Sequence, residues 1–186
     1  MRIQTLSPYS AAFPGLFIKK FVCLAFLGAF ICGCAGIGNR AVVVGEPEHE
    51  VVNKLGIPNN IYKDGAARLL EYKTGPWSQQ TYMARIGPEG KLVSYEQVLT
   101  DEKFAGIAVG HATKDDVLRR VGSPSETSYL SLKNLEVWSY PYKESGTWNS
   151  VMHVHFNQRG IVDSLQNTQD LRFDRDARFP FMMMGL

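Results

Sequence analysis

The chain has 186 residues, of which 45% are hydrophobic and 20% are charged, a composition typical of one globular domain or of two very small ones. Its formal net charge is only +2, and nothing in the sequence indicates nucleic-acid binding. The Gly-x-Ser-x-Gly, phosphate-loop and His-Glu-x-x-His motifs do not occur in it. We therefore expect a protein that is not an enzyme, with no catalytic residue and no cofactor.

The N-terminus has the pattern of a secretory signal. Arg2, Lys19 and Lys20 precede the apolar run 21–31, and small residues follow it. The mostly apolar stretch 21–36 is shorter than the ~20 residues that a helix needs to cross a bilayer, which argues against a permanent membrane anchor. Without the three basic residues of the signal, seventeen basic residues remain against eighteen acidic ones, so the mature chain is close to neutral.

A short helix is predicted over residues 113–121. Thr113 is a candidate N-cap, Asp116 completes a capping-box pattern three residues later, and Gly122 is expected to end the helix in the left-handed αL conformation. An upstream copy, residues 44–58, shares the opening Val-Gly, the apolar positions and the closing Gly-x-Pro. The chain is therefore expected to use one small unit twice.

Each predicted helix is followed by short segments with the alternation typical of strands. These segments are 59–65, 68–72, 81–86 and 92–99 in the first copy and 129–132, 135–140, 151–156 and 161–165 in the second, where another helical turn begins at Thr100. The predicted fold is α+β, with two tandem repeats that each contain a short capped helix, or helix pair, followed by an antiparallel meander of about three to four strands. The two repeats would share a continuous sheet or pack side by side.

The resulting division has five parts. They are a signal peptide (1–33), a tether (34–41), a first repeat (42–99), a second repeat (100–172) and a C-terminal tail (173–186). The tail ends in an apolar segment, 179–186, which either packs on the body or binds a partner.

The second repeat resembles the BamE family of small bacterial lipoproteins, also called SmpA or OmlA. The resemblance rests on Gly110 to Val117, Val121-Gly122-Ser123-Pro124, Trp138-x-Tyr140, Val154-x-Phe156 and Gly160-x-Val162, with weaker matches at Val51 to Pro58, Leu70-x-Tyr72 and Tyr82 through Gly90-x-Leu92. The duplicated architecture is also similar to that of β-lactamase inhibitory proteins. The BamE resemblance implies an accessory lipoprotein of outer-membrane β-barrel assembly, and none of the family's contact residues is transferred.

The sequence Ile31-Cys32-Gly33-Cys34 resembles the bacterial lipobox, in which the cysteine is acylated and becomes the new N-terminus. The resemblance implies that Cys34 carries the lipid, for example palmitate, and that residues 1–33 are removed. Ala35 after the cysteine favours the periplasmic face of the outer membrane, and retention in the inner membrane is the alternative.

Two tryptophans are candidate partner-binding anchors. Trp77 and Trp148 follow Gly75-Pro76 and Gly146-Thr147 at corresponding places of the two copies, where loops are expected. Tryptophans in loops either contact partners or fold back to cover the core. Tyr142 is a third partner-binding candidate.

Two histidines of the second repeat are candidate metal ligands. His153 and His155 share one face of the predicted strand 151–156, and two imidazoles at this spacing could begin a metal site. Asp163 is the sole nearby candidate for a third ligand. We therefore favour solvent-facing strand histidines and predict no metal site.

These observations favour a non-enzymatic, lipid-anchored periplasmic protein-binding module that supports envelope or outer-membrane protein assembly. Its expected partners are the membrane, through the lipid on Cys34, and an envelope protein, with the outer-membrane β-barrel assembly machinery as the candidate. One alternative is a periplasmic inhibitor or sensor that docks an enzyme through an aromatic sheet face. The other is a metal-binding periplasmic lipoprotein built on His153 and His155.

Overall fold

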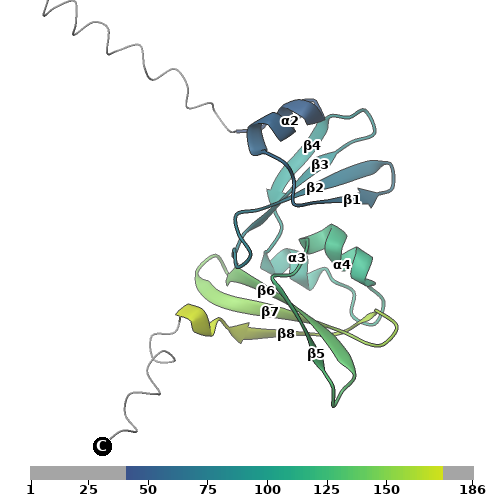
Figure 1. The fold of residues 1–186 in the computed structure, drawn as a ribbon, viewed down its shortest axis with the longest axis vertical. Coiled ribbons are helices and arrows are strands. Elements are labelled where there is room, and N and C mark those ends of the chain that lie inside the picture. Colours follow the sequence, from purple (N-terminus) through teal and green to yellow (C-terminus); the bar gives the residue numbers. More distant parts are fainter. Residues whose placement is uncertain (1–40, 174–186) are drawn as a thin grey trace, which may run out of the picture. The chain divides into compact units, whose positions relative to one another are not determined.

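The computed structural model describes residues 41–173, and the predicted signal peptide, Cys34 and all but the first residue of the tail lie outside this range. The fold is α+β and consists of two tandem repeats (Figure 1). The first contains α2 (Glu48–Leu55), β1 (Asn60–Asp64), β2 (Ala67–Lys73), β3 (Thr81–Ile86) and β4 (Leu92–Gln97). The second contains α3 (Asp101–Ala105), α4 (Lys114–Val121), β5 (Glu126–Leu130), β6 (Leu135–Glu144), β7 (Trp148–Phe156), β8 (Val162–Gln169) and the 3-10 helix η1 (Leu171–Phe173). Between residues 41 and 173, no helix is long and apolar enough to span a membrane.

The two repeats have separate sheets, so they pack side by side and do not share a continuous sheet. Each sheet is an antiparallel meander, in the order β1-β2-β3-β4 and β5-β6-β7-β8. Helix α2 covers one face of the first sheet, where Val51 packs with Leu70, Ala84 and Ile86. Helices α3 and α4 cover the equivalent face of the second sheet, where Phe104 and Val117 join the core. Figure 1 shows the resulting layers in chain order: α2, first sheet, α3 with α4, second sheet.

The helix caps follow from local sequence. Thr113 Oγ1 accepts a hydrogen bond from the Asp116 N–H at 3.2 Å, and the Asp116 carboxylate accepts one from the Thr113 N–H at 2.9 Å. This is the predicted capping box. Hydrogen bonds to Thr113 and then to Arg119 lower the pKa of Asp116 to about 2.

The helix ends have positive φ, but the predicted αL conformation is wrong. Gly122 has φ 81° and ψ −168°, and Gly56, at the end of α2, has φ 91° and ψ −172°. Their N–H groups close the last helical turns on Leu118 O and Val52 O. The extended ψ sends the chain directly toward the next strand, and this region of φ and ψ is almost exclusive to glycine.

The hairpin between β6 and β7 is longer than the sequence predicts. Strand β6 runs to Glu144, which pairs directly with Trp148 of β7. Only residues 145–147 connect the strands, and Ser145 and Gly146 take φ of 48° and 70°. Because two successive positive φ values allow a very tight connection, the expected wide loop around Gly146 is replaced by paired strand.

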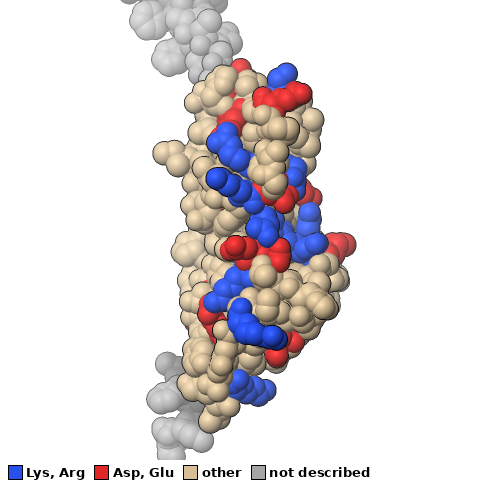
Figure 2. All heavy atoms as spheres, turned by 90° about the vertical axis from the view of Figure 1, so that its right-hand side faces the viewer, with Lys and Arg blue, Asp and Glu red and all other residues tan. Residues whose placement is uncertain are grey.

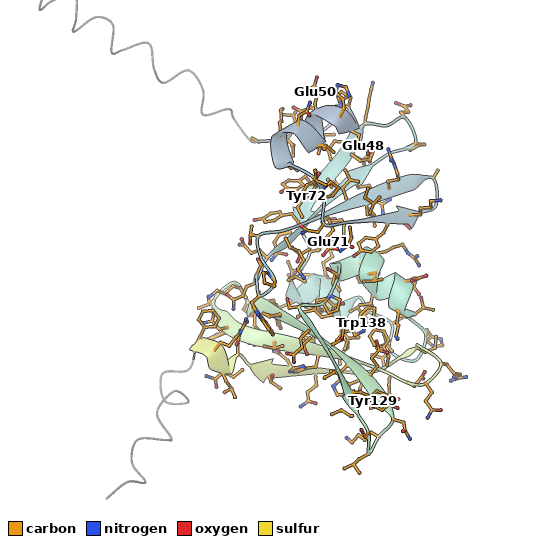
Figure 3. The ribbon with its side chains drawn as sticks, in the orientation of Figure 1. Glu48, Glu50, Glu71, Tyr72, Tyr129 and Trp138 are labelled. Carbon is orange, nitrogen blue, oxygen red and sulfur yellow. The ribbon has the colours of Figure 1, made fainter. Side chains whose placement is uncertain are left out.

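A buried carboxylate joins the repeats. Glu71 of β2 is fully buried and points toward α4, while its neighbour Tyr72 points to the side of α2 (Figure 3). The Glu71 carboxylate accepts hydrogen bonds from Asn60 Nδ2 at 2.8 Å, from the Tyr62 hydroxyl at 2.5 Å, and from Ser123. Burial, and then the Glu71 hydrogen bond, raise the pKa of Tyr62. Four donors thus compensate the desolvation of one charge.

Candidate protein-binding surface

Trp77 lies in the segment between β2 and β3, as the sequence predicts. Its side chain is 50% exposed. The Arg172 guanidinium lies 4.9 Å from the centre of its ring, within the range of a cation–π interaction. Thr74 and Ser78 share a hydrogen bond of 2.7 Å between their hydroxyls, which ties the ends of this segment together.

Trp148 is the first residue of β7 and not a loop residue, because the hairpin is paired up to its turn. Its side chain is 70% exposed. It lines a cavity of about 440 Å³ together with Phe173 and polar residues of β8. A large aromatic side chain fixed at a strand end and open to solvent has the character of an interface anchor.

Helix η1 brings the two tryptophans into one surface. Arg172 lies 4.9 Å from the Trp77 ring and 5.7 Å from the Phe173 ring. Gln79, two residues after Trp77, donates a hydrogen bond of 3.0 Å to Asn149, the residue after Trp148. We call the exposed side chains of Trp77, Trp148, Leu171 and Phe173 the aromatic patch.

Asp170 holds η1 in place. Its N–H donates to Asn149 O at 2.9 Å, and its carboxylate accepts hydrogen bonds from the Arg172 N–H at 3.1 Å and from Arg172 Nε at 2.8 Å. Burial opposes the charge of Asp170, but Arg172 outweighs it, so the pKa of the carboxyl lies below its ordinary value. The hydrogen bond to Asp170 is also the main reason that the pKa of Arg172 is raised. The Arg172 guanidinium is therefore fixed where it contacts the rings of Trp77 and Phe173.

Sequence reasoning missed the part of the patch that η1 supplies. Leu171 and Arg172 are the last residues of the predicted second repeat, and Phe173 is the first residue of the predicted tail. The sequence signal for this turn was Asp170-x-Arg172, because an aspartate side chain often accepts a hydrogen bond from the backbone N–H two residues later and so forms a turn.

The structure places Tyr142 in the core of the second repeat. Its side chain is 1% exposed and packs against Phe104, with ring centres 4.9 Å apart. The alternation of β6 turns Trp138, Tyr140 and Tyr142 to the same covered face. Tyr142 therefore does not belong to the candidate surface.

The expectation that both histidines face solvent is wrong, because His155 is buried and His153 is half-buried. His153 has Ser139 Oγ 2.9 Å from Nδ1 and Thr168 Oγ1 3.0 Å from Nε2, so both ring nitrogens are engaged. Burial is the main cause that lowers the pKa of His153 and of His155. Among residues 41–173, no group of three His, Cys, Asp or Glu side chains is arranged to hold a metal ion.

A second cavity, of about 520 Å³, lies between the first sheet and helices α3 and α4. Its charged side chains include three ion pairs: Arg85–Asp64, Lys103–Glu96 and Arg119–Asp116. Figure 2 shows Lys and Arg interspersed with Asp and Glu on the face that it views, and no broad patch of one sign. Six of the seven Lys, Arg, Asp and Glu side chains that line this cavity are paired in this way and Arg120 is not, so we favour the aromatic patch as the candidate site.

Comparisons with known proteins find a family match over the second repeat. Residues 96–166 match the family model described as the outer membrane protein assembly factor BamE domain, which confirms the BamE-like resemblance. No curated protein matches the chain. Among solved structures, a DUF4309 family protein (YjgB) from Bacillus subtilis subsp. subtilis str. 168 is similar at 12% identity, over 67% of this chain and 79% of that chain, with a TM-score of 0.29. A TM-score this low supports no further argument.

Proposed function

Because residues 96–166 form a BamE-like domain, we propose that this chain is a non-enzymatic protein-binding module that supports protein assembly at the outer membrane. The observation that carries the proposal is that η1 connects tryptophans of different repeats: Arg172 lies over the Trp77 ring, and Phe173 lines one cavity with Trp148. Tryptophan and arginine are the residue types most enriched among the side chains that dominate binding energy at interfaces. The partner is proposed to be an envelope protein, with the outer-membrane β-barrel assembly machinery as the first candidate.

The proposed location is the periplasmic face of the outer membrane, with lipid on Cys34 as the anchor. The lipobox-like sequence before Cys34 supports the anchor, and the BamE-like domain supports the envelope location.

Affinity purification from detergent-solubilised envelopes, followed by mass spectrometry, tests this function. Trp148→Ala is expected to lose the partners that the unaltered chain recovers, because removing an interface anchor weakens binding by about 2 kcal/mol or more. Trp77→Ala is expected to show the same loss to a smaller extent, since Arg172 already covers part of its ring. Thermal melts of both variants should stay near that of the unaltered chain.

Tyr129→Ala is the matched control, because Tyr129 is an exposed aromatic residue of β5 outside the aromatic patch. This variant should retain every partner. Full recovery of partners by both tryptophan variants would remove the aromatic patch from the proposed binding surface. A large fall in melting temperature would instead assign the tryptophans to fold stability.

A further inference from the structure

The cavity beside Trp148 is built by three strands at one end of the second sheet. The strand registers place Glu144 of β6 opposite Trp148 of β7, and Ser150 of β7 opposite Gln169 of β8. Because side chains alternate along a strand, these four residues lie on one face of the sheet. All four line the cavity, whose volume of about 440 Å³ is within the ~300–1,000 Å³ range of small-molecule sites. The site thus rests on paired strands, and Phe173 of η1 adds a second aromatic ring to its lining.

Among residues 41–173, the lining combines two aromatic rings with polar side chains, and it includes no aliphatic and no basic side chain. Trp148 and Phe173 are the aromatic residues, and the others carry amides, hydroxyls and carboxylates. An apolar ligand would leave these polar groups without hydrogen-bond partners. An anion would find no Lys, Arg or His side chain in this lining. The composition of the lining therefore disfavours both of these ligand classes.

The two carboxylates of the lining are offset by cations beside it. Arg172 forms an ion pair with Asp170, and Lys143 donates a hydrogen bond of 2.7 Å to the lining residue Asn149. The Arg172 guanidinium also lies 5.7 Å from the centre of the Phe173 ring, so this ring already faces a cation. A cationic ligand would be repelled by both of these positive charges. A ligand without net charge therefore fits the cavity better than a cation.

Three side chains of the lining have hydrogen-bonding capacity left. Glu144 Oε2 accepts a hydrogen bond from Ser150 Oγ at 2.7 Å, but Glu144 Oε1 makes no hydrogen bond with residues 41–173. The Asn149 carbonyl oxygen already accepts two hydrogen bonds, which leaves its NH2 group to donate. The Gln169 side chain makes no hydrogen bond with the described part of the chain. The lining thus offers donors and acceptors together.

We propose that this cavity binds a neutral saccharide. A pyranose ring has C–H groups that pack on an aromatic face, and hydroxyl groups that each donate and accept hydrogen bonds. Trp148 and Phe173 supply the aromatic faces. Glu144, Asn149 and Gln169 supply the hydrogen bonds. The inference goes beyond the protein-binding function, and the saccharide site shares with the aromatic patch only its two rings.

The test is an NMR titration of the isotope-labelled full chain in a detergent without a sugar headgroup. The probes are three neutral trisaccharides: chitotriose, cellotriose and maltotriose. At least one is expected to shift the indole N–H resonance of Trp148 and the side-chain amide resonances of Gln169. The indole resonance of Trp138, whose N–H donates to Glu136, should stay unchanged. The proposal is overturned if no probe shifts Trp148 and Gln169 at concentrations up to about 10 mM, where even weak binding is detectable. Tighter binding of choline than of every trisaccharide would assign the cavity to cations and overturn it as well.

Variants separate the saccharide site from the protein-binding function. Gln169→Ala should weaken binding of the best trisaccharide at least fivefold, because it removes a donor and an acceptor. Gln166→Ala is the matched control, since Gln166 is an exposed amide of β8 that does not line the cavity. Equal trisaccharide binding by these two variants would contradict the proposal. Trp77→Ala should bind the trisaccharide normally and recover fewer envelope partners, whereas Gln169→Ala should recover all of them, so the failure of one function is distinguishable from the failure of the other.

Discussion

The Glu71 carboxylate of the first repeat accepts two hydrogen bonds from Ser123 of the second, one from the backbone N–H at 3.0 Å and one from Oγ at 2.7 Å. Lys73 adds contacts to the carbonyl oxygens of Ser123 and Pro124, at 3.1 and 3.2 Å. Burial is the main cause that lowers the pKa of Lys73. The repeats are therefore joined by polar contacts of defined direction, which fix how the end of α4 meets the first sheet.

Glu71→Gln should destabilise the chain by about 2 kcal/mol, because the buried acceptor loses its charge and its new NH2 group must face hydrogen-bond donors. Urea unfolding measures the change. Glu126→Gln, at an exposed position of β5, is the control and should change stability by less than about 0.5 kcal/mol. Equal effects of the two substitutions would mean that the junction contributes little to folding.

Gly56 and Gly122 have nearly the same backbone conformation. Substitutions at the two positions therefore distinguish backbone strain from steric overlap. Gly56→Ala should cost about 1 to 3 kcal/mol because of its backbone alone, since a Cβ there meets nothing within 4 Å. A Cβ on Gly122 would lie 2.9 Å from Glu71 Oε1 and 3.1 Å from Thr81 Cγ2. Gly122→Ala should therefore lower stability by at least about 1 kcal/mol more than Gly56→Ala in thermal melts. Equal losses of stability would show that Glu71 and Thr81 can move away from the new Cβ without a cost in free energy.

The capping box predicts an acid-dependent loss of stability. Because folding lowers the pKa of Asp116 to about 2, the ionised carboxylate stabilises the fold above its ordinary pKa, and this contribution is lost as the pH falls toward 2. The side chain is half exposed, so the contribution is about 1 kcal/mol or less after solvent screening. In melts from about pH 5 to about pH 2, the deficit of Asp116→Asn should shrink as the pH falls.

Asp115→Asn is the control for this titration, because Asp115 makes no hydrogen bond or ion pair with residues 41–173. Its melting temperature should follow that of the unaltered chain at every pH. A deficit of Asp116→Asn that is constant across the pH range would argue against the carboxylate as the titrating cap.

Cys34→Ser should abolish lipid attachment and leave the precursor uncleaved, because acylation of that sulfur precedes cleavage in the proteins whose lipobox this sequence resembles. Metabolic labelling with a clickable fatty acid, followed by gel analysis, measures both effects. Cys32→Ser is the matched control and should still incorporate label. Label on the Cys34→Ser protein would place the anchor elsewhere.

Local patterns predicted the parts of the fold that depend on neighbouring residues. The Thr113–Asp116 capping box, the helix end at Gly122 and the order of the strands all follow from spacings of a few residues. The ψ angle of Gly122 did not follow, because it depends on the direction in which the chain enters the next strand, and Gly56 takes nearly the same conformation before β1.

The candidate surface depends on long-range contacts, and sequence reasoning recovered only part of it. Trp77 and Trp148 were identified from equivalent positions, but the cation that lies over Trp77 comes from a residue 95 positions later. Tyr142 was misplaced because the predicted strand 135–140 ends before it, whereas β6 continues to Glu144 and turns Tyr142 into the core. The role of Glu71 was not predicted, since its donors come from four side-chain and backbone groups in two repeats.

The contact that joins the two repeats has no second copy among residues 41–173. At the position of the second sheet equivalent to Glu71 stands Ser139, which is hydrogen-bonded to His153. At the position of the first repeat equivalent to Ser123 stands Ile57, which is 89% exposed. Two units of similar fold have thus diverged at the residues through which they meet, so each is adapted to one side of a single junction.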